Sequence, residues 1–505
     1  MSTVVQTRSF ASRLRAAFAA NPARARVVFL VVLALVVLGM SLKYAAKIEK
    51  PGDGGLQSRS AFLRWRTMIH EIFAGTNVYV GVHEYPNPPI MAVVLKPFAD
   101  LPPTTGALAW FYAKVLMVCV AAVWVFRLFG GKNPSPSPSP KRGGETDGTP
   151  TSLAGKGAGG LGTADPSPSP SPKRGGESDT TPPSLAGKGA GGLGFPDTAK
   201  AIAIVLALPP LLGDLSHNNV NIFILFLIAG CLEAYRRGWD IASGLVLGLA
   251  IACKVTPLMF LAFFLYKRAG KVVAGCVLGL ALWLVVVPGA IFGWERNLEL
   301  LESWNSLMVK PALVDNRVTS EHPNQSIPGV VFRLFTHSPS FVVYPDNIPT
   351  PAAFHNFADI GTDAARWVVK GCLVGFALVI LLLCRAPRIE RQGWRFAAEC
   401  SLIVLGMLLF SERTWKHHAV TLLLPFATIV YCAFNEGFSR RIRRWLIAVL
   451  VGVSVLTNLP GVLPPRASDL AMVYGSYTVA FLLLTVGIAT ILRQTRDRRS
   501  ISEAR

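Results

Sequence analysis

The strongest candidate for chemistry is a run of one aromatic and three basic side chains, Trp415-Lys416-His417-His418, at the start of an apolar stretch. A helix beginning near Thr414 would add the N–H groups and the positive dipole end of its N-terminus to these side chains. The combination is typical of an anion site. The alternative is that both histidines only occupy a helix start at a membrane interface. Zinc is not expected, because no further His or Cys stands at ligand spacing.

A second candidate is Asp53, which stands in the flexible turn Lys-Pro-Gly-Asp-Gly-Gly. This turn leaves a carboxylate at the surface, and the alternative is an ordinary solvated turn aspartate. The stretch 58–75 that follows is amphipathic, with apolar Phe62, Trp65 and Ile69 opposite basic residues. Such a pattern suits a helix that lies in the membrane interface.

Three more groups of polar residues stand near the ends of apolar stretches. They are Asn218, Asn219 and Asn221, then Lys254, then Asn324, Gln325 and Ser326 followed by Arg333. Each group also has a structural interpretation: asparagines cap helices, a lysine snorkels from a short helix, and an Asn-Gln-Ser run forms a turn. The substrate-binding and structural interpretations both stay open at this point.

The elements that must position these residues are membrane-spanning helices. Hydrophobic residues make up 51% of the 505 residues, and the mean hydropathy is +0.44. A spanning helix needs roughly 20 mainly apolar residues. The candidate stretches are 27–46, 106–129, 200–212, 220–234, 272–289, 367–384, 396–410, 419–434, 445–459 and 470–492. A further block, 241–266, is interrupted by Lys254 and Pro257 and predicts a hairpin of two short helices. We therefore expect an all-α polytopic membrane protein with about 10–12 transmembrane helices.

The basic residues predict the orientation of these helices. They cluster before the first helix and in alternate loops, at 236–237, 267–271, 385–395, 440–444 and 493–499. The positive-inside rule places these loops and both termini in the cytoplasm, in a multi-pass protein of the inner or plasma membrane. The acids, among them Asp53, Glu71, Asp214, Glu295 and Glu412, are expected in loops on the opposite side. The formal charge of +21 then reflects topology, and no nucleic-acid surface is predicted.

These patterns divide the chain into five parts. Residues 1–26 form a cytoplasmic segment, and residues 27–132 form the first helices with an outer loop at 47–105. Residues 133–197 form an insertion. Residues 198–492 form a core with a second outer loop at 290–365, and residues 493–505 form a cytoplasmic tail. We expect the first helix to be an uncleaved anchor, the alternative being a signal peptide, because its basic leader is long and Lys43 and Lys47 disfavour a cleavage site.

The insertion is a tandem repeat. The segment 134–162 recurs at 166–194, and the copies differ at three of 29 positions. Alternating Pro-Ser and Gly-rich composition buries too little apolar surface to fold, so a disordered and dispensable loop is predicted. The alternative is a partner-binding role for the Pro-rich runs.

The order of motifs along the chain carries a family resemblance. The motifs are Asp53 after the first helix, Gly75-Thr76-Asn77-Val78-Tyr79, Tyr85-Pro86-Asn87-Pro88-Pro89, His217-Asn218-Asn219-Val220-Asn221, a Gly-rich stretch from 244 ending in Lys254-x-x-Pro257, Asn324-Gln325-Ser326 with Arg333, and Ser411 through His418. Together they resemble the polyprenol-phosphate-mannose-dependent mannosyltransferases of the C-type glycosyltransferase superfamily, of the family-87 type. The resemblance covers the chain outside the insertion. The family more often has Gly-Gln-x-Asn where this chain has His217-Asn218-Asn219-Val220-Asn221.

This resemblance implies transfer of a hexose, mannose in the first place, from a polyprenyl-phosphate donor to an acceptor hydroxyl on the extracytoplasmic face, with inversion. Because the leaving group is already a phosphate, the reaction needs a base and cationic stabilisation but no general acid. The resemblance implies Asp53 as the base, with His417 and His418 as its catalytic partners. The implied contacts to the donor phosphate or substrate are Lys416, Arg333, Lys254, Asn219, Asn221, Asn324, Gln325 and Tyr85.

Two other functions compete with this one. A lipid or solute transporter would place ionisable residues at mid-membrane on broken helices, and a lipid-linked glycan polymerase or ligase would use a diphosphate donor. The expected acceptor is lipid-linked or a glycan. No cofactor is expected and the outer loops carry no DxD-type motif, while a divalent metal stays an open alternative.

The predicted orientation can be tested by labelling. A cysteine introduced at Ser58 or Ser338 should react with a membrane-impermeant maleimide in intact cells, above the level of the parent chain, because both positions lie in predicted outer loops. A cysteine at Ser439 should react only after permeabilisation. The reverse pattern would place the proposed chemistry on the cytoplasmic side.

Overall fold

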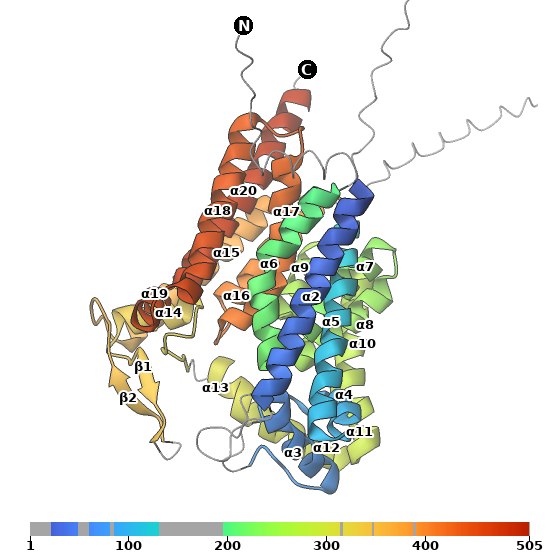
Figure 1. The fold of residues 1–505 in the computed structure, drawn as a ribbon, viewed down its shortest axis with the longest axis vertical. Coiled ribbons are helices and arrows are strands. Elements are labelled where there is room, and N and C mark those ends of the chain that lie inside the picture. The colour runs from blue at the N-terminus through green and yellow to red at the C-terminus, as the bar shows by residue number, and fades with distance from the viewer. Residues whose placement is uncertain are drawn as a thin grey trace, which may run out of the picture. The chain divides into compact units, whose positions relative to one another are not determined.

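The computed structural model describes residues 22–48, 60–80, 85–130, 195–313, 317–345, 348–386 and 390–503. These residues belong to one unit built from 1–131 and 194–505, shown in Figure 1. The repeats predicted at 133–197 fall almost entirely outside the described residues, as does Asp53. The predicted domain boundaries and the disorder of the insertion therefore stay predictions.

Long apolar helices form most of this unit. Eight helical stretches within the described ranges are long and apolar enough to cross a membrane. They are α2 (Pro22–Ile48), α5 (Pro103–Arg127), α6 (Asp197–His217), α10 (Gly270–Leu280) continued by η1 (Ala281–Val286) and α11 (Val287–Phe292), α15 (Thr362–Leu383), η4 (Lys416–Leu422) continued by α17 (Leu423–Phe434), α18 (Arg440–Val462) and α20 (Ser476–Glu503). The prediction of an all-α polytopic membrane protein is confirmed. Two further apolar helices, α7 (Asn221–Arg236) and α16 (Trp394–Leu409), are almost wholly buried.

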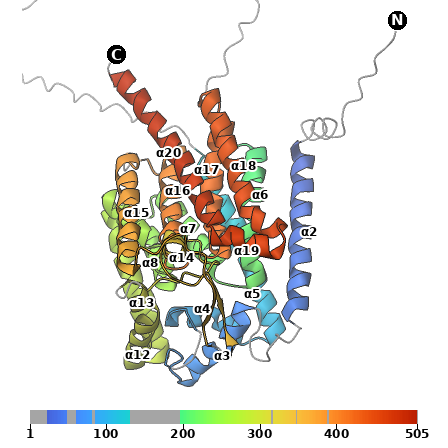
Figure 2. The same cartoon turned by 90° about the vertical axis from the view of Figure 1, so that its left-hand side faces the viewer.

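The predicted inner loops meet at one end of this unit. Figures 1 and 2 both show the start of α2 and the end of α20 at that end. Contacts confirm that the loops adjoin one another: Arg391 pairs with Asp240, Lys267 Nζ lies 2.7 Å from Glu399 Oε2, and the Gly393 N–H donates to the Leu128 carbonyl. The helices thus alternate in direction as expected, and the membrane side of each end stays a prediction.

The predicted hairpin consists of α8 (Asp240–Cys253) and α9 (Leu258–Tyr266), with Lys254 at its tip. Glycines let α8 pack closely along α10. A Cβ added at Gly244 would come 2.2 Å from the Val272 carbonyl oxygen, and one at Gly275 would come 2.4 Å from the Ile241 oxygen. This close backbone contact fixes α8 against α10.

Short helices cover that other end. They are α3 (Ala61–Ala74), α4 (Pro89–Ala99), α12 (Trp294–Trp304), η2 (Asn305–Val309), α13 (Lys310–Leu313), α14 (Ile327–Phe335) and α19 (Pro465–Val473). A small antiparallel pair, β1 (Phe341–Val343) and β2 (Thr350–Ala353), follows α14 with Phe341 opposite Ala353.

The amphipathic stretch predicted for the membrane interface has its apolar face against the protein, and its position relative to a membrane stays a prediction. It forms α3, and Phe62, Trp65 and Ile69 are buried within the protein. Arg296 of α12 donates to the Ile72 carbonyl at the end of α3, at 3.0 Å. The apolar face therefore packs on the protein itself, and an amphipathic pattern alone does not distinguish these two environments.

The close contact between α8 and α10 generates a prediction. Gly244→Ala should lower the free energy of unfolding by about 1–3 kcal/mol, because the new methyl group meets backbone atoms that cannot rotate away. The matched control is Gly371→Ala on α15, where a Cβ has no atom within 4 Å. The midpoint of thermal unfolding in detergent measures both variants. Equal midpoints for the two would contradict this account of the packing.

Candidate active site

Polar residues converge where α6 ends, α7 begins, the α8–α9 hairpin turns and η4 starts. The turn between α6 and α7 depends on Asn218, which has a left-handed backbone with φ of 54°. Asparagine tolerates this conformation better than most residues. Its buried side-chain amide donates to the Tyr44 hydroxyl at 2.8 Å and to the Ala107 carbonyl at 3.0 Å. Asn218 thus joins α2, α5 and the turn.

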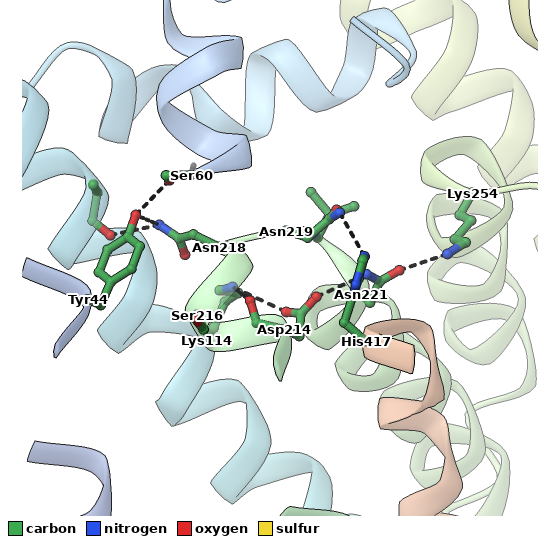
Figure 3. A network of polar contacts seen from close by, with 12 residues as sticks. Tyr44, Ser60, Lys114, Asp214, Ser216, Asn218, Asn219, Asn221, Lys254 and His417 are labelled. Carbon is green, nitrogen blue, oxygen red and sulfur yellow. Dashed lines mark hydrogen bonds and ion pairs between the residues drawn. The ribbon is translucent and has the colours of Figure 1, made fainter. Parts of the chain in front are cut away.

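A buried polar chain runs beneath this turn, as Figure 3 shows. Lys114 Nζ of α5 lies 3.2 Å from Asp214 Oδ2 of α6, and neither side chain is exposed. Asn221 Nδ2 donates to Asp214 Oδ1 at 2.9 Å, and Lys254 Nζ donates to Asn221 Oδ1 at 2.7 Å. These contacts connect α5, α6 and α7 with the residue that follows α8, at the level of the site.

Two cavities border the first turn of η4. One has a volume of about 220 Å³ and is lined by Pro209, Pro210, Gly213, Ser216, His217, Lys416, His417 and Tyr477. The other is lined by Asn221, Ile224, Lys254, Thr256, Met407, Leu408, Ser411, Thr414, His418 and Thr421. The two neighbouring histidines therefore face different spaces, which the sequence did not indicate. We name these the His417 cavity and the Lys254 cavity.

The histidine rings differ in their partners. His417 is buried, its ring centroid lies 4.7 Å from that of His217, and its Nε2 lies 3.5 Å from Asn219 Nδ2. His418 Nδ1 lies 3.1 Å from the Arg413 carbonyl oxygen and 3.3 Å from the Trp415 N–H. The turn before η4 thus engages one side of the His418 ring, whereas the His417 ring lies beside His217 at a different cavity.

The helix begins at Lys416, two residues later than predicted. The reason is that neighbouring residues bind the backbone of Thr414: its N–H donates to Asn324 Oδ1 at 2.9 Å, and its carbonyl accepts from the Gln325 N–H at 2.7 Å. The Asn324 amide also donates to the Glu412 carbonyl. Asn324 and Gln325 thereby position the segment that carries both histidines. Burial raises the pKa of the neighbouring Glu412.

Arg333 has a comparable structural environment. Its buried guanidinium donates to the carbonyls of Ser320, Glu321, Asn324, Met472 and Val473, at 2.8–3.3 Å. Desolvation lowers the pKa of Arg333 to about 10, so the side chain stays cationic at neutral pH. It lines neither of the two cavities. Its bonds join the segment before α14 to the end of α19.

The remaining predicted site residues lie in different places. Lys416 is exposed at the His417 cavity, Lys254 and Asn221 belong to the polar chain, and Asn219 lies beside His417. Tyr85 is buried away from both cavity linings, with its ring 6.3 Å from that of Trp65. Within the described ranges, no group of three or more His, Cys, Asp or Glu residues could hold a metal ion.

The sequence analysis misplaced one residue of the polar chain, Asp214, and missed another, Lys114. Asp214 was expected in an outer loop, but it lies in the last turns of α6 and is fully buried. Lys114 lies in the middle of the apolar stretch 106–129 and received no role. A lysine inside a spanning helix is costly without a partner, so this position was the signal that could have found the pair.

Comparison with known proteins gives one family. The sequence profile of glycosyltransferase family 87 matches residues 85–411. No curated protein matches the chain significantly. Among solved structures, the chain is similar to the crystal structure of ArnT from Cupriavidus metallidurans bound to undecaprenyl phosphate, at 13% sequence identity and a TM-score of 0.36. That alignment covers 93% of this chain and 78% of the other.

Proposed function

Because the chain belongs to glycosyltransferase family 87, we propose that it transfers a hexose, specifically mannose, from a polyprenyl-phosphate donor to the hydroxyl of a lipid-linked or glycan acceptor. The proposed reaction takes place on the extracytoplasmic face and inverts the anomeric carbon. The observation that carries this proposal is the His417 cavity, where Lys416, His217 and His417 gather at the ends of spanning helices. Cationic and hydrogen-bonding groups at such a place suit the phosphate of a lipid carrier.

An apolar path supports a lipid donor. Ile202 and Val205 on α6 are 37% and 51% exposed, and Pro209 lines the His417 cavity. Spacings of three and four residues place these side chains on one face of the helix. An isoprenoid tail lying along this face in the bilayer would bring its phosphate to Lys416 and His417.

The residues that flank the proposed base in the sequence are bonded close to the same site. Asp53 itself lies outside the described residues, and the described residues on either side of its segment bond to the α6–α7 turn or to Tyr44, which contacts that turn. Lys47 Nζ donates to the Ser216 carbonyl at 2.9 Å. The Ser60 hydroxyl lies 2.7 Å from the Tyr44 hydroxyl, which accepts from Asn218.

The chemistry is a single displacement. The acceptor oxygen attacks the anomeric carbon, the bond from that carbon to the phosphate oxygen breaks, and Asp53 takes the acceptor proton. The donor is a phosphodiester, and the electron pair of the broken bond stays on the departing bridging oxygen, whose charge is shared with the two non-bridging oxygens as the phosphate leaves. Lys416 and His417 would stabilise this charge from one side of the η4 turn, and Lys254 from the other. Attack opposite the leaving group explains inversion.

Asp53→Asn tests the proposed base. The transfer rate from undecaprenyl-phosphate mannose should fall roughly 100- to 10,000-fold, the usual contribution of a positioned base. Binding of undecaprenyl phosphate should stay near the wild-type level, because the amide keeps the size of the carboxylate. Radiolabelled sugar transfer in membranes measures the rate. Turnover at the wild-type rate would assign the proton transfer to another group.

His417→Ala and His418→Ala form a matched pair that tests the phosphate site. His417→Ala should raise the donor KM and lower kcat roughly 100-fold, the size expected when one group that stabilises developing charge is lost. His418→Ala should chiefly lower the unfolding midpoint, because the His418 ring is bonded to the turn before η4. The kinetic constants are measured per folded molecule. Unchanged donor kinetics in His417→Ala would remove the His417 cavity from the mechanism.

A further inference from the structure

The proposed reaction gives no role to the buried carboxylate that lies beside the site. Asp214 is fully buried, and its two oxygens accept from Lys114 and Asn221. Lys114 Nζ also donates to the Asp214 backbone carbonyl at 3.0 Å. The pair lies between the two cavities, since the preceding Gly213 lines the His417 cavity and Asn221 lines the Lys254 cavity.

The charge of Asp214 determines the orientation of Asn221. An ionised carboxylate only accepts hydrogen bonds, so the Asn221 amide must direct its NH₂ group toward Asp214. The carbonyl oxygen of the same amide must then point the opposite way. The Lys254 ammonium donates to this oxygen at 2.7 Å. If the amide were reversed, NH₂ would face the ammonium and both hydrogen bonds would be lost.

The position of the Lys254 side chain depends on its contact with Asn221, because the backbone around Lys254 is not helical. Lys254 follows the last residue of α8, has an extended conformation with φ of −157°, and stands three residues before Pro257, the residue that precedes α9. A lysine side chain has four rotatable bonds and much conformational entropy to lose. The contact with Asn221 selects the conformation that keeps the ammonium at the Lys254 cavity.

We propose that Asp214 is a positioning residue that acts through Asn221 to hold the Lys254 ammonium toward a phosphate oxygen of the donor, while Lys114 balances the buried charge. This inference rests on the proposed function, because it takes the donor to be a polyprenyl-phosphate sugar. It assigns the buried pair a purpose in substrate binding beyond joining α5 to α6.

A double-mutant cycle tests the proposal on the full chain in detergent. Asp214→Asn should raise the KM for undecaprenyl-phosphate mannose about tenfold and weaken binding of undecaprenyl phosphate to a similar degree, as expected for coupled residues in one network. In a Lys254→Ala background, the same substitution should change the KM less than about twofold, since its effect passes through Lys254. Independent, multiplicative effects on KM would overturn the proposal.

A second variant keeps the test decisive if Asp214→Asn folds poorly. Asn221→Leu breaks the connection and leaves the Lys114–Asp214 pair intact, so it should raise KM by a comparable factor and also lose this effect in the Lys254→Ala background. The matched control is Glu399→Gln, which alters another fully buried carboxylate paired with Lys267. It should lower the unfolding midpoint without changing the donor KM. A KM increase in this control as large as that of Asp214→Asn would indicate a general packing effect and overturn the proposal.

A readout without donor separates failure of this inference from failure of the proposed function. Acetylation of Lys254 by acetic anhydride, followed by peptide mass spectrometry, reports on the freedom of its amine. Asp214→Asn should change the labelling rate of Lys254 severalfold and leave that of Lys96 unchanged. Wild-type protein that neither binds undecaprenyl phosphate nor transfers mannose would refute the proposed function. An unchanged Lys254 labelling rate would refute the positioning role.

Discussion

The burial of a complete ion pair is the constraint on which the site depends. Lys114 and Asp214 are both fully buried, 100 residues apart in the chain, and their helices must meet at this point for either charge to be tolerated. Removing one partner of such a pair typically costs about 3–5 kcal/mol, because the remaining charge is left unpaired. The pair therefore restricts how α5 and α6 can slide past each other. The turn at Asn218, the start of α7 and the His417 cavity all follow directly from the end of α6.

A second set of contacts fixes the segment that brings the histidines to this place. Arg333 and Gln325 bind carbonyls at the end of α19, and Asn324 binds the backbone of Thr414. Backbone groups are obligatory hydrogen-bonding partners when buried, so these side chains hold their segments at defined distances. The residues predicted to touch substrate thus divide into two kinds. Some line the cavities, and others, such as Arg333, line neither cavity and bind the backbone of neighbouring segments.

The helices themselves are held by a different interaction. Within a bilayer, apolar surface gives little preference for a protein neighbour over lipid, so close backbone contact and internal polar bonds decide the packing. The glycines between α8 and α10 supply the close contact and the Lys114–Asp214 pair supplies the polar bond. Both act on the same region, because the α8–α9 hairpin carries Lys254 to the end of the chain of contacts that starts at Lys114.

The sequence alone determined the class of protein, the position of most helices and the α8–α9 hairpin. It also singled out Lys416, His417 and Lys254 as candidate site residues. These conclusions rest on local composition and on the length that a bilayer requires, which are properties of continuous segments. Only the tertiary structure decided that Asp214 is buried with Lys114, that α3 packs on the protein, that Arg333 joins two segments, and that neighbouring histidines face different cavities. The physical reason is that each of these facts depends on a partner far away in the chain. A pattern of apolar and polar residues records whether a side chain is compatible with burial, but not which group neutralises or binds it there.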